Sequence, residues 1–211
     1  MRVIPVVNKP FDSYCYIVTK DDKNCLIIDL GGDFSVIEGV LKAENLTPLA
    51  VLLTHSHFDH VCGIKSARNK GVPVYISQND AKNLESADGT LSSFVGVNYA
   101  PVFDYQTLDE KFYLFGDILV EVICTPGHTS GSLVYKINDL IFSGDTVFKG
   151  TVGRTDLPSG SYSDIKKSVN RLITRLLNEN TNYKIYPGHG DFTDFYTELK
   201  SNPYFLEWKN A

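Results

Sequence analysis

The stretch 51-VLLTHSHFDHVCG-63 joins an apolar run to a polar segment that holds three of the five histidines of the chain. The apolar run, VLL, has the composition of a buried strand, and the polar residues start directly after it. His55 and His57 stand two positions apart, so on an extended segment their side chains point the same way. Asp59 and His60 follow, in a loop or a first helical turn, and aim differently. This arrangement suits two metal ions better than one.

The other two histidines and one aspartate also follow apolar runs that are typical of strands. His128 lies in TPGHTSGS after the run ILVEVIC, and His189 lies in YPGHGD after YKIY. Asp145 follows the run DLIFSG. Because strand ends at one edge of a sandwich can converge in space, we expect these side chains to meet those of the first segment. Imidazole and carboxylate donors without thiolate suit Zn, Fe, Mn, Co or Ni, and the sequence does not choose among them.

Elsewhere the apolar pattern alternates between short strand-like runs and longer helical ones. Helical spacing predicts helices over residues 33–46 and 162–180, the first capped by Asp33 or Ser35 and the second by Ser163. Shorter helices are expected over 61–69 and 194–202. Strands with a few intervening helices predict an α/β (α+β) class, with two sheets covered by helices, in one domain spanning 1–211. The expected strands are residues 3–7, 14–18, 25–29, 50–54, 73–76, 111–115, 118–124, 132–137, 139–144 and 183–186.

Composition and charge narrow the partners and the compartment. The 211 residues are 43% apolar and 21% charged, as in ordinary globular proteins. A formal charge of −5 without a basic stripe predicts no nucleic-acid partner. Lys9, Pro10 and Asp12 interrupt the region that a signal peptide needs apolar, and no apolar run approaches the ~20 residues of a membrane span. We therefore expect a cytoplasmic protein without a membrane partner, whose four scattered cysteines are buried thiols.

The order of the donors resembles a known family. His55-Ser-His57-Phe-Asp59-His60, then His128, Asp145 and His189, with IIDLGG (27–32) ahead of them, resembles the metallo-β-lactamase superfamily. Within it, TPGHTSGS and SGDTVFKGTVGRTDLPSG resemble the short bacterial forms of the glyoxalase II-like hydrolases, the hydroxyacylglutathione hydrolases. The resemblance implies a four-layer αββα sandwich with the metal site at one edge between the two sheets. It also implies two divalent metal ions, for which zinc is the first expectation and iron or manganese the alternatives. His55, His57 and His128 would bind one ion, and Asp59, His60 and His189 the other, with Asp145 bridging both.

The chemistry of such a centre favours a thioester as the substrate. Two metal ions that share a water lower its pKa toward about 7, and Asp59 and Asp145 complete the catalytic centre. A thiolate leaves readily because the pKa of its thiol is about 8.5, whereas an amide nitrogen generally needs a proton donor. We expect a metal-dependent hydrolase that cleaves a small-molecule thioester, such as S-D-lactoylglutathione, with a metal-bridged hydroxide. The resemblance is compatible with a homodimer.

Four further residues are candidates for substrate contacts. Lys149 and Arg154 are placed to hold a substrate carboxylate, although Arg154 can instead pair with Asp156 as part of the scaffold. Tyr99 and Phe148 are candidate pocket residues, although aromatic side chains are commoner in cores. Classical glyoxalase II has a longer C-terminal helical region with glutathione contacts, whereas only about twenty residues follow His189 here. The thiol part of the substrate can therefore be glutathione or another thiol carrier.

Other activities share this skeleton. Persulfide dioxygenases also carry a GRTD segment and bind one Fe(II) through the first two histidines, the later histidine and the bridging-type aspartate. Such an oxidoreductase is the main alternative. A β-lactamase of one major zinc class would have a cysteine in place of Asp145. A purely structural zinc site is usually closed and rich in cysteine, whereas seven His and Asp donors leave positions open for water and substrate.

Overall fold

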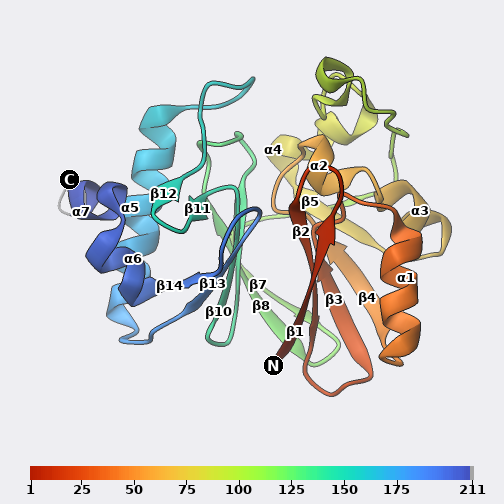
Figure 1. Cartoon of the computed structure of the whole chain (residues 1–211), viewed down its shortest axis with the longest axis horizontal. Coiled ribbons are helices and arrows are strands. Elements are labelled where there is room, and N and C mark those ends of the chain that lie inside the picture. Colours follow the sequence, from red (N-terminus) through yellow and green to blue (C-terminus); the bar gives the residue numbers. More distant parts are fainter. Residues whose placement is uncertain (210–211) are drawn as a thin grey trace.

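The computed structural model describes residues 1–209, whose apolar runs form two large sheets (Figure 1). The first sheet has six strands in the order β1-β2-β3-β4-β5-β6. Its first three strands pair antiparallel, and β3 to β6 pair parallel. The strands are β1 (Arg2–Asn8), β2 (Ser13–Thr19), β3 (Asn24–Ile28), β4 (Thr47–Leu52), β5 (Val74–Ser77) and β6 (Gln106–Leu108).

The second sheet has six strands in the order β14-β13-β10-β9-β8-β7. Only β10 and β13 pair parallel, and the other neighbours are antiparallel. A two-stranded ribbon, β11 (Val147–Phe148) and β12 (Thr151–Val152), follows β10. The sheet consists of β7 (Phe112–Phe115), β8 (Ile118–Cys124), β9 (Leu133–Ile137), β10 (Leu140–Gly144), β13 (Lys184–Pro187) and β14 (Thr193–Asp194).

Helices cover the outer face of each sheet (Figure 1). The Asp33 side chain accepts a hydrogen bond from the Ser35 backbone N–H at 2.8 Å, so Asp33 caps the first helix as one of its two predicted caps. Beside the first sheet lie α1 (Phe34–Ala43), α2 (Phe58–Val61), α3 (Ile64–Asn69), α4 (Gln78–Ala81) and two 3-10 helices, η1 (Lys82–Glu85) and η2 (Ser92–Val95). Beside the second lie α5 (Tyr162–Asn178), α6 (Phe195–Ser201) and α7 (Pro203–Trp208).

Three apolar cores separate these layers. One joins the first sheet to α1 and α3 through residues such as Ile27 and Ile37. The central core lies between the sheets, where Leu52 and Phe142 are fully buried. The third packs the apolar stripe of α5 against the second sheet, with Trp208 of α7. The order helix, sheet, sheet, helix confirms the predicted four-layer sandwich.

Two local predictions need correction, and one segment without a prediction is structured. The helix expected over 61–69 is shorter: α2 ends at Val61, the chain turns at Cys62 and Gly63, and α3 spans Ile64–Asn69. A Cβ at Gly63 would lie 2.1 Å from the Gly32 carbonyl oxygen, so the turn packs closely against that segment. The cap of α5 is Ser161 rather than Ser163, since its hydroxyl oxygen accepts from the Asp164 N–H. The segment between β5 and β7 was given no structure from the sequence, yet it holds α4, η1, η2 and β6.

Hydrogen bonds between the two sheets fix the edge where the strands end. The Tyr135 hydroxyl of β9 donates to the Leu53 carbonyl at 2.6 Å, just before the first histidine segment. The Tyr16 hydroxyl of β2 donates to the Pro187 carbonyl at 2.5 Å, just before His189. The two halves of the sandwich are therefore tied together at this edge.

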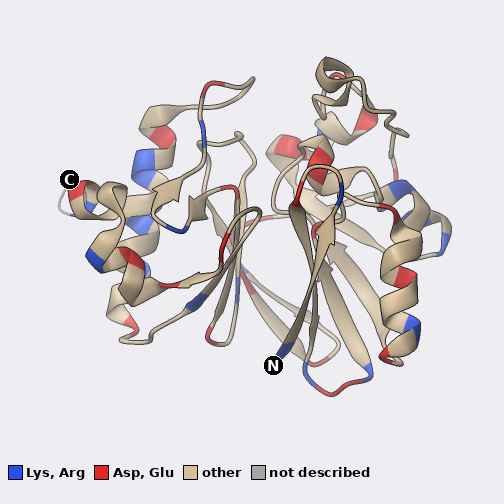
Figure 2. Ribbon diagram, viewed as in Figure 1, with Lys and Arg blue, Asp and Glu red and all other residues tan. Residues whose placement is uncertain are grey.

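The outer layers carry charges of both signs. Figure 2 shows Lys and Arg interspersed with Asp and Glu over both helical layers. Within residues 1–209, none of the helices combines the length and hydropathy that crossing a membrane requires.

Candidate metal centre

The first group of donors comes from both halves of the sandwich. His55 and His57 follow the end of β4, and His128 lies in the turn after β8. Their ligand atoms lie within 4.8 Å of one another, and all three side chains are buried. His57 Nδ1 and His128 Nε2 are 2.9 Å apart. The structure thus brings together the three residues expected to share one metal ion.

A second group lies beside the first. Asp59 and His60 occupy the single turn of α2, and His189 follows β13. Their ligand atoms also lie within 4.8 Å of one another. His189 Nε2 is 3.0 Å from Asp59 Oδ2 and 3.3 Å from His60 Nε2. These are the three residues expected to hold the other ion.

Asp145, directly after β10, lies between the two groups. Its Oδ1 is 3.4 Å from His60 Nε2 of the second group, and its Oδ2 is 3.5 Å from His128 Nε2 of the first. A single carboxylate therefore reaches both groups, one oxygen to each of these two rings. Gly188 makes the approach feasible, since a Cβ there would lie 2.1 Å from Asp145 Oδ1.

Two orphaned atoms show that these residues fit a bound cation. His55 Nε2 and Asp145 Oδ1 are buried, and neither makes a hydrogen bond with any described residue. Buried polar atoms normally have partners, and metal ions satisfy imidazole nitrogen and carboxylate oxygen in this way. The cluster is therefore a centre for divalent metal ions, whose element the donors do not select.

The charges of the cluster point to the same conclusion. Burial lowers the pKa of His57 to about 4, with further lowering by His128, so its ring is neutral at pH 7, as a ligand must be. Burial also opposes a charge on His60, yet Asp59, Asp145 and Asp29 outweigh it and raise the pKa of His60 to about 10. The carboxylates thus attract positive charge, which metal ions would supply.

Outer contacts orient the ligand rings. Asp29, after β3, accepts from His60 Nδ1 at 2.9 Å and from the Thr54 N–H at 2.7 Å. The Arg154 carbonyl oxygen lies 2.9 Å from His128 Nδ1 and accepts its proton. Such contacts fix the tautomer of a metal-binding histidine and direct its other nitrogen to the metal. The sequence assigned no role to Asp29, although IIDLGG contributed to the resemblance.

Asp80 was also missed by the sequence interpretation. It is buried, and its Oδ2 accepts from the Ser56 N–H at 3.0 Å and from the Thr129 hydroxyl at 2.8 Å. Ser56 lies between two histidine ligands, and Thr129 follows another. Asp80 therefore joins the two loops that build the first group. Its signal in the sequence, an aspartate just after a strand, is shared with many ordinary turns.

The four expected substrate contacts lie in different surroundings. Lys149 is exposed and pairs with Asp191 at 2.9 Å. Arg154 makes two hydrogen bonds of 2.7 Å to Asp156, as the scaffold alternative predicted. The Phe148 ring stands near His189, with centroids 6.4 Å apart. Tyr99 packs against the outer core and donates its hydroxyl to the Leu84 carbonyl, so these contacts belong to the core rather than to a pocket.

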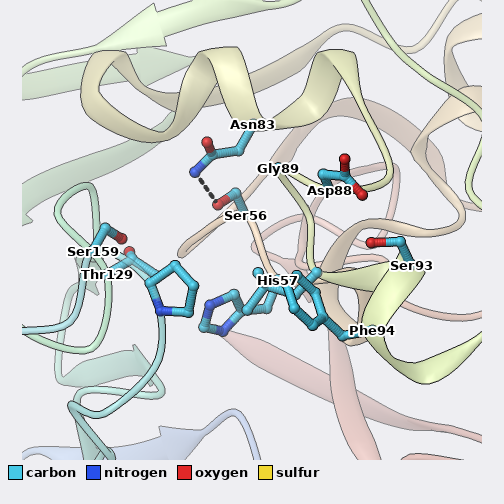
Figure 3. A pocket seen from close by; sticks show the side chains of 11 residues that line it. Ser56, His57, Asn83, Asp88, Gly89, Ser93, Phe94, Thr129 and Ser159 are labelled. Atoms are coloured by element: carbon cyan, nitrogen blue, oxygen red, sulfur yellow. Dashed lines mark hydrogen bonds between the residues drawn. The ribbon is translucent and has the colours of Figure 1, made fainter.

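A pocket of about 590 Å³ opens beside His57 (Figure 3). The lining residues come from the histidine loop, the segment 83–94 and the loops around Thr129 and Ser159. Ser56 accepts a hydrogen bond from Asn83 on its wall at 2.9 Å. The pocket gives a small molecule access to the first group of ligands.

Comparisons with known proteins agree with this site. A model of the metallo-beta-lactamase superfamily matches residues 8–189, which include all seven donors. The chain is 37% identical over 201 residues to the probable metallo-hydrolase YqgX of Bacillus subtilis, covering 92% of this chain and 93% of that protein. It is 32% identical over 213 residues to the hydroxyacylglutathione hydrolase GloC of Haemophilus influenzae, covering 97% of each.

Solved structures share the fold. The BLEG-1 B3 metallo-beta-lactamase superposes with a TM-score of 0.88 and 32% identity, over 97% of this chain and 99% of that one. TTHA1623 in a di-iron-bound form superposes with a TM-score of 0.85 and 31% identity, over 96% of this chain and 100% of that one. ETHE1 from Myxococcus xanthus superposes with a TM-score of 0.72 and 23% identity, over 98% of this chain and 89% of that one. At this identity the likeness is one of fold alone. With its donors gathered at the edge of this sandwich, the chain belongs among the metallo-hydrolases of the metallo-beta-lactamase superfamily.

Proposed function

We propose that the protein is a dinuclear metal-dependent hydrolase of thioesters, with S-D-lactoylglutathione as the first substrate to assay. The observation that carries the proposal is the position of Asp145 between two complete groups of three donors. Either group alone could hold one ion, and the shared carboxylate favours a pair.

The protein's own residues prepare this centre for hydrolysis. Divalent ions bound there would lower the pKa of a water and stabilise negative charge on a carbonyl oxygen. Asp29 holds the His60 ring, and the Arg154 carbonyl holds the His128 ring, in the orientation that a ligand needs. These rings come from opposite sheets, so the centre requires the closed sandwich.

The pocket favours a leaving group that needs no proton donor. Among the described residues that line it, none is Lys, Arg, Tyr or Cys, and His57 is already a ligand candidate. A thiolate departs without protonation, since thiols have a pKa of about 8.5. In the reaction, water oxygen bonds to the acyl carbon, and the C–S bond breaks with its electron pair leaving on sulfur. The products at neutral pH are a carboxylate, a thiol and one released proton.

The main alternative is a persulfide dioxygenase with a single iron. Such an enzyme would use His55, His57, His128 and Asp145 and leave the second group unused. The close approach of His189 to Asp59, 3.0 Å, instead favours a second ion. The similarity to GloC supports thioester hydrolysis, and the likeness to ETHE1 extends to the fold alone.

Turnover assays test the proposal. Protein reconstituted with Zn, Fe or Mn is incubated with S-D-lactoylglutathione, and thiol release is followed with a chromogenic disulfide. We expect hydrolysis that Asp145→Asn abolishes and that the exposed control Asp109→Asn leaves unchanged. The absence of turnover with every metal would overturn the glutathione thioester assignment. Oxygen uptake with glutathione persulfide by a form holding one iron would favour the dioxygenase, and opening of a chromogenic cephalosporin would favour a lactamase.

A further inference from the structure

An apolar groove of about 370 Å³ adjoins the pocket beside His57. Leu91, Phe94 and Pro158 line both hollows, so the two share a wall. The volume lies in the range of about 300–1,000 Å³ that is usual for small-molecule sites. We call this hollow the acyl groove. Its apolar lining consists of Phe58, Leu91, Phe94, Val95, Leu157 and Pro158.

The acyl groove is built next to the ligands of the first group. Phe58 directly follows His57, and its ring rests edge-on against Phe11, with centroids 4.8 Å apart. Arg154, which also lines the groove, accepts the hydrogen bond of His128 through its backbone carbonyl. A molecule in the groove would therefore contact residues that adjoin two candidate metal ligands, His57 and His128.

Large apolar side chains face solvent at this groove. Phe94 is 76% exposed and Val95 is 51% exposed, both in η2. Exposed apolar groups that cluster beside a catalytic cleft are typical of a binding surface. Among the described residues that line the groove, Arg154 is the one cation, and it is already paired with Asp156 through two hydrogen bonds. The groove thus offers apolar contact and no free positive charge.

The backbone is strained at the junction of the two hollows. Leu91 has φ of 62° and ψ of 10°, a left-handed conformation that a branched apolar residue rarely adopts. Glycine would adopt this conformation without strain, but it would contribute no side chain to the lining. Strain of this kind is commonly found where a side chain serves a ligand site.

The adjoining pocket differs in chemistry. Its polar lining consists of hydroxyls, an amide, the His57 imidazole and the Asp88 carboxylate, with no Lys or Arg among the described residues. A carrier with two carboxylates would find no cation there, whereas a neutral polar thiol carrier would find hydrogen-bond partners. The division into a polar pocket and an apolar groove matches a thioester with one polar and one apolar end.

We propose that the acyl groove binds the apolar acyl chain of the substrate, so that the enzyme prefers medium-length aliphatic or aryl thioesters over acetyl or lactoyl ones. This inference rests on the proposed thioester hydrolysis. It assigns Phe94 and Leu91 as residues that determine acyl specificity, while the polar pocket receives the carrier.

The test varies the acyl chain on one neutral thiol. The metal-loaded protein is assayed with acetyl, butyryl and hexanoyl thioesters of N-acetylcysteamine. Each methylene that enters the groove should raise kcat/KM by about fourfold. We expect the hexanoyl-to-acetyl ratio to fall at least about fivefold in Phe94→Ser and in Leu91→Gly. The control Phe103→Ser, which alters a phenylalanine that is 69% exposed and outside the groove lining, should keep the ratio.

Leu91→Gly separates specificity from damage to the fold. Because glycine adopts this left-handed conformation without strain, which offsets the larger entropy of its unfolded chain, this variant should melt close to the temperature of the unaltered protein while it loses chain-length preference. Equal kcat/KM values for all three acyl chains, or a ratio that neither variant changes, would overturn the proposal.

A binding measurement keeps the inference apart from the proposed reaction. The non-hydrolysable thioethers S-hexyl- and S-ethyl-N-acetylcysteamine are titrated calorimetrically into the metal-loaded protein. Tighter binding of the hexyl compound, lost in Phe94→Ser and kept in Phe103→Ser, supports the groove even if no thioester turns over. Equal affinity for both compounds contradicts it even if thioesters are hydrolysed.

Discussion

His57 and His128, 71 residues apart in the sequence, face each other with Nδ1 and Nε2 separated by 2.9 Å. One ring follows a strand of the first sheet and the other follows a strand of the second, so their meeting depends on how the two sheets are joined. The Asp80 carboxylate supplies that join near the rings, through Ser56 and Thr129.

Asp80→Ala should therefore weaken both the fold and the first group of ligands. The buried Ser56 N–H would lose its acceptor, which costs about 1–3 kcal/mol, and the Thr129 hydroxyl would keep only its contact with the Ser132 hydroxyl. Outer contacts of this kind usually change metal affinity by about 10–100-fold. Urea unfolding and metal titration measure the two effects.

Two further variants interpret the Asp80 result. Asp80→Asn keeps an acceptor oxygen, so it should retain more affinity than Asp80→Ala. The exposed Asp88→Ala should change neither unfolding nor metal binding. If Asp80→Ala bound metal as tightly as the unaltered protein, the idea that this carboxylate positions the ligand loops would be wrong.

Gly188→Ala should disrupt the centre sterically. A Cβ at this position would lie 2.1 Å from Asp145 Oδ1 and 2.7 Å from His60 Cε1. Overpacking typically costs about 1–3 kcal/mol, and here the atoms that must move are ligand groups. We expect loss of bound metal and of hydrolysis, measured by metal analysis and thiol release.

Gly39→Ala is the matched control for this glycine substitution. Gly39 lies within α1, and a Cβ there would meet nothing within 4 Å. Alanine should stabilise the helix by about 1 kcal/mol and leave metal content unchanged. Full metal occupancy in Gly188→Ala would contradict the close packing around Asp145.

The metal-free protein should show a distinctive dependence of stability on pH. His57 has a pKa of about 4 in the folded chain, below the value near 6.5 of the unfolded chain. Between these values the unfolded chain binds more protons, so the free energy of unfolding falls as the pH drops. His60 has a folded pKa of about 10, so its contribution is complete below about pH 6.5 and is lost as the pH rises toward 10.

These two histidines together place the greatest stability of the chelator-treated protein near pH 6.5. Urea unfolding from about pH 5 to 9.5 measures this dependence. Metal ions should flatten it, because bound ligands no longer exchange protons in this range. Stability of the metal-free protein that rises steadily from pH 6.5 to 9 would contradict the charges inferred for His60.

Much of the centre could be predicted because its donors follow strands directly. The pairing of His55 with His57, and the placement of Asp145 and His189 at strand ends, needed only local pattern. The grouping of the seven into two sites came from the family resemblance, since nothing local states which strand ends meet.

What the sequence missed depends on contacts between distant segments. Asp80 looks like any polar residue after a strand until the fold places it against Thr129. The short helices η1 and η2 have too few residues for a periodic signal, so the wall of the pocket and the acyl groove stayed hidden. Ser161 and Ser163 are both suitable caps by type, and only backbone geometry distinguishes them.

The most direct test of the central claim is the metal content of the protein purified without chelators and offered Zn, Fe and Mn. Elemental mass spectrometry should find about two metal ions per chain in the unaltered protein, and about one or fewer in Asp145→Ala. If the unaltered protein bound no metal, or if Asp145→Ala bound two ions as firmly, the seven donors would not form a dinuclear centre.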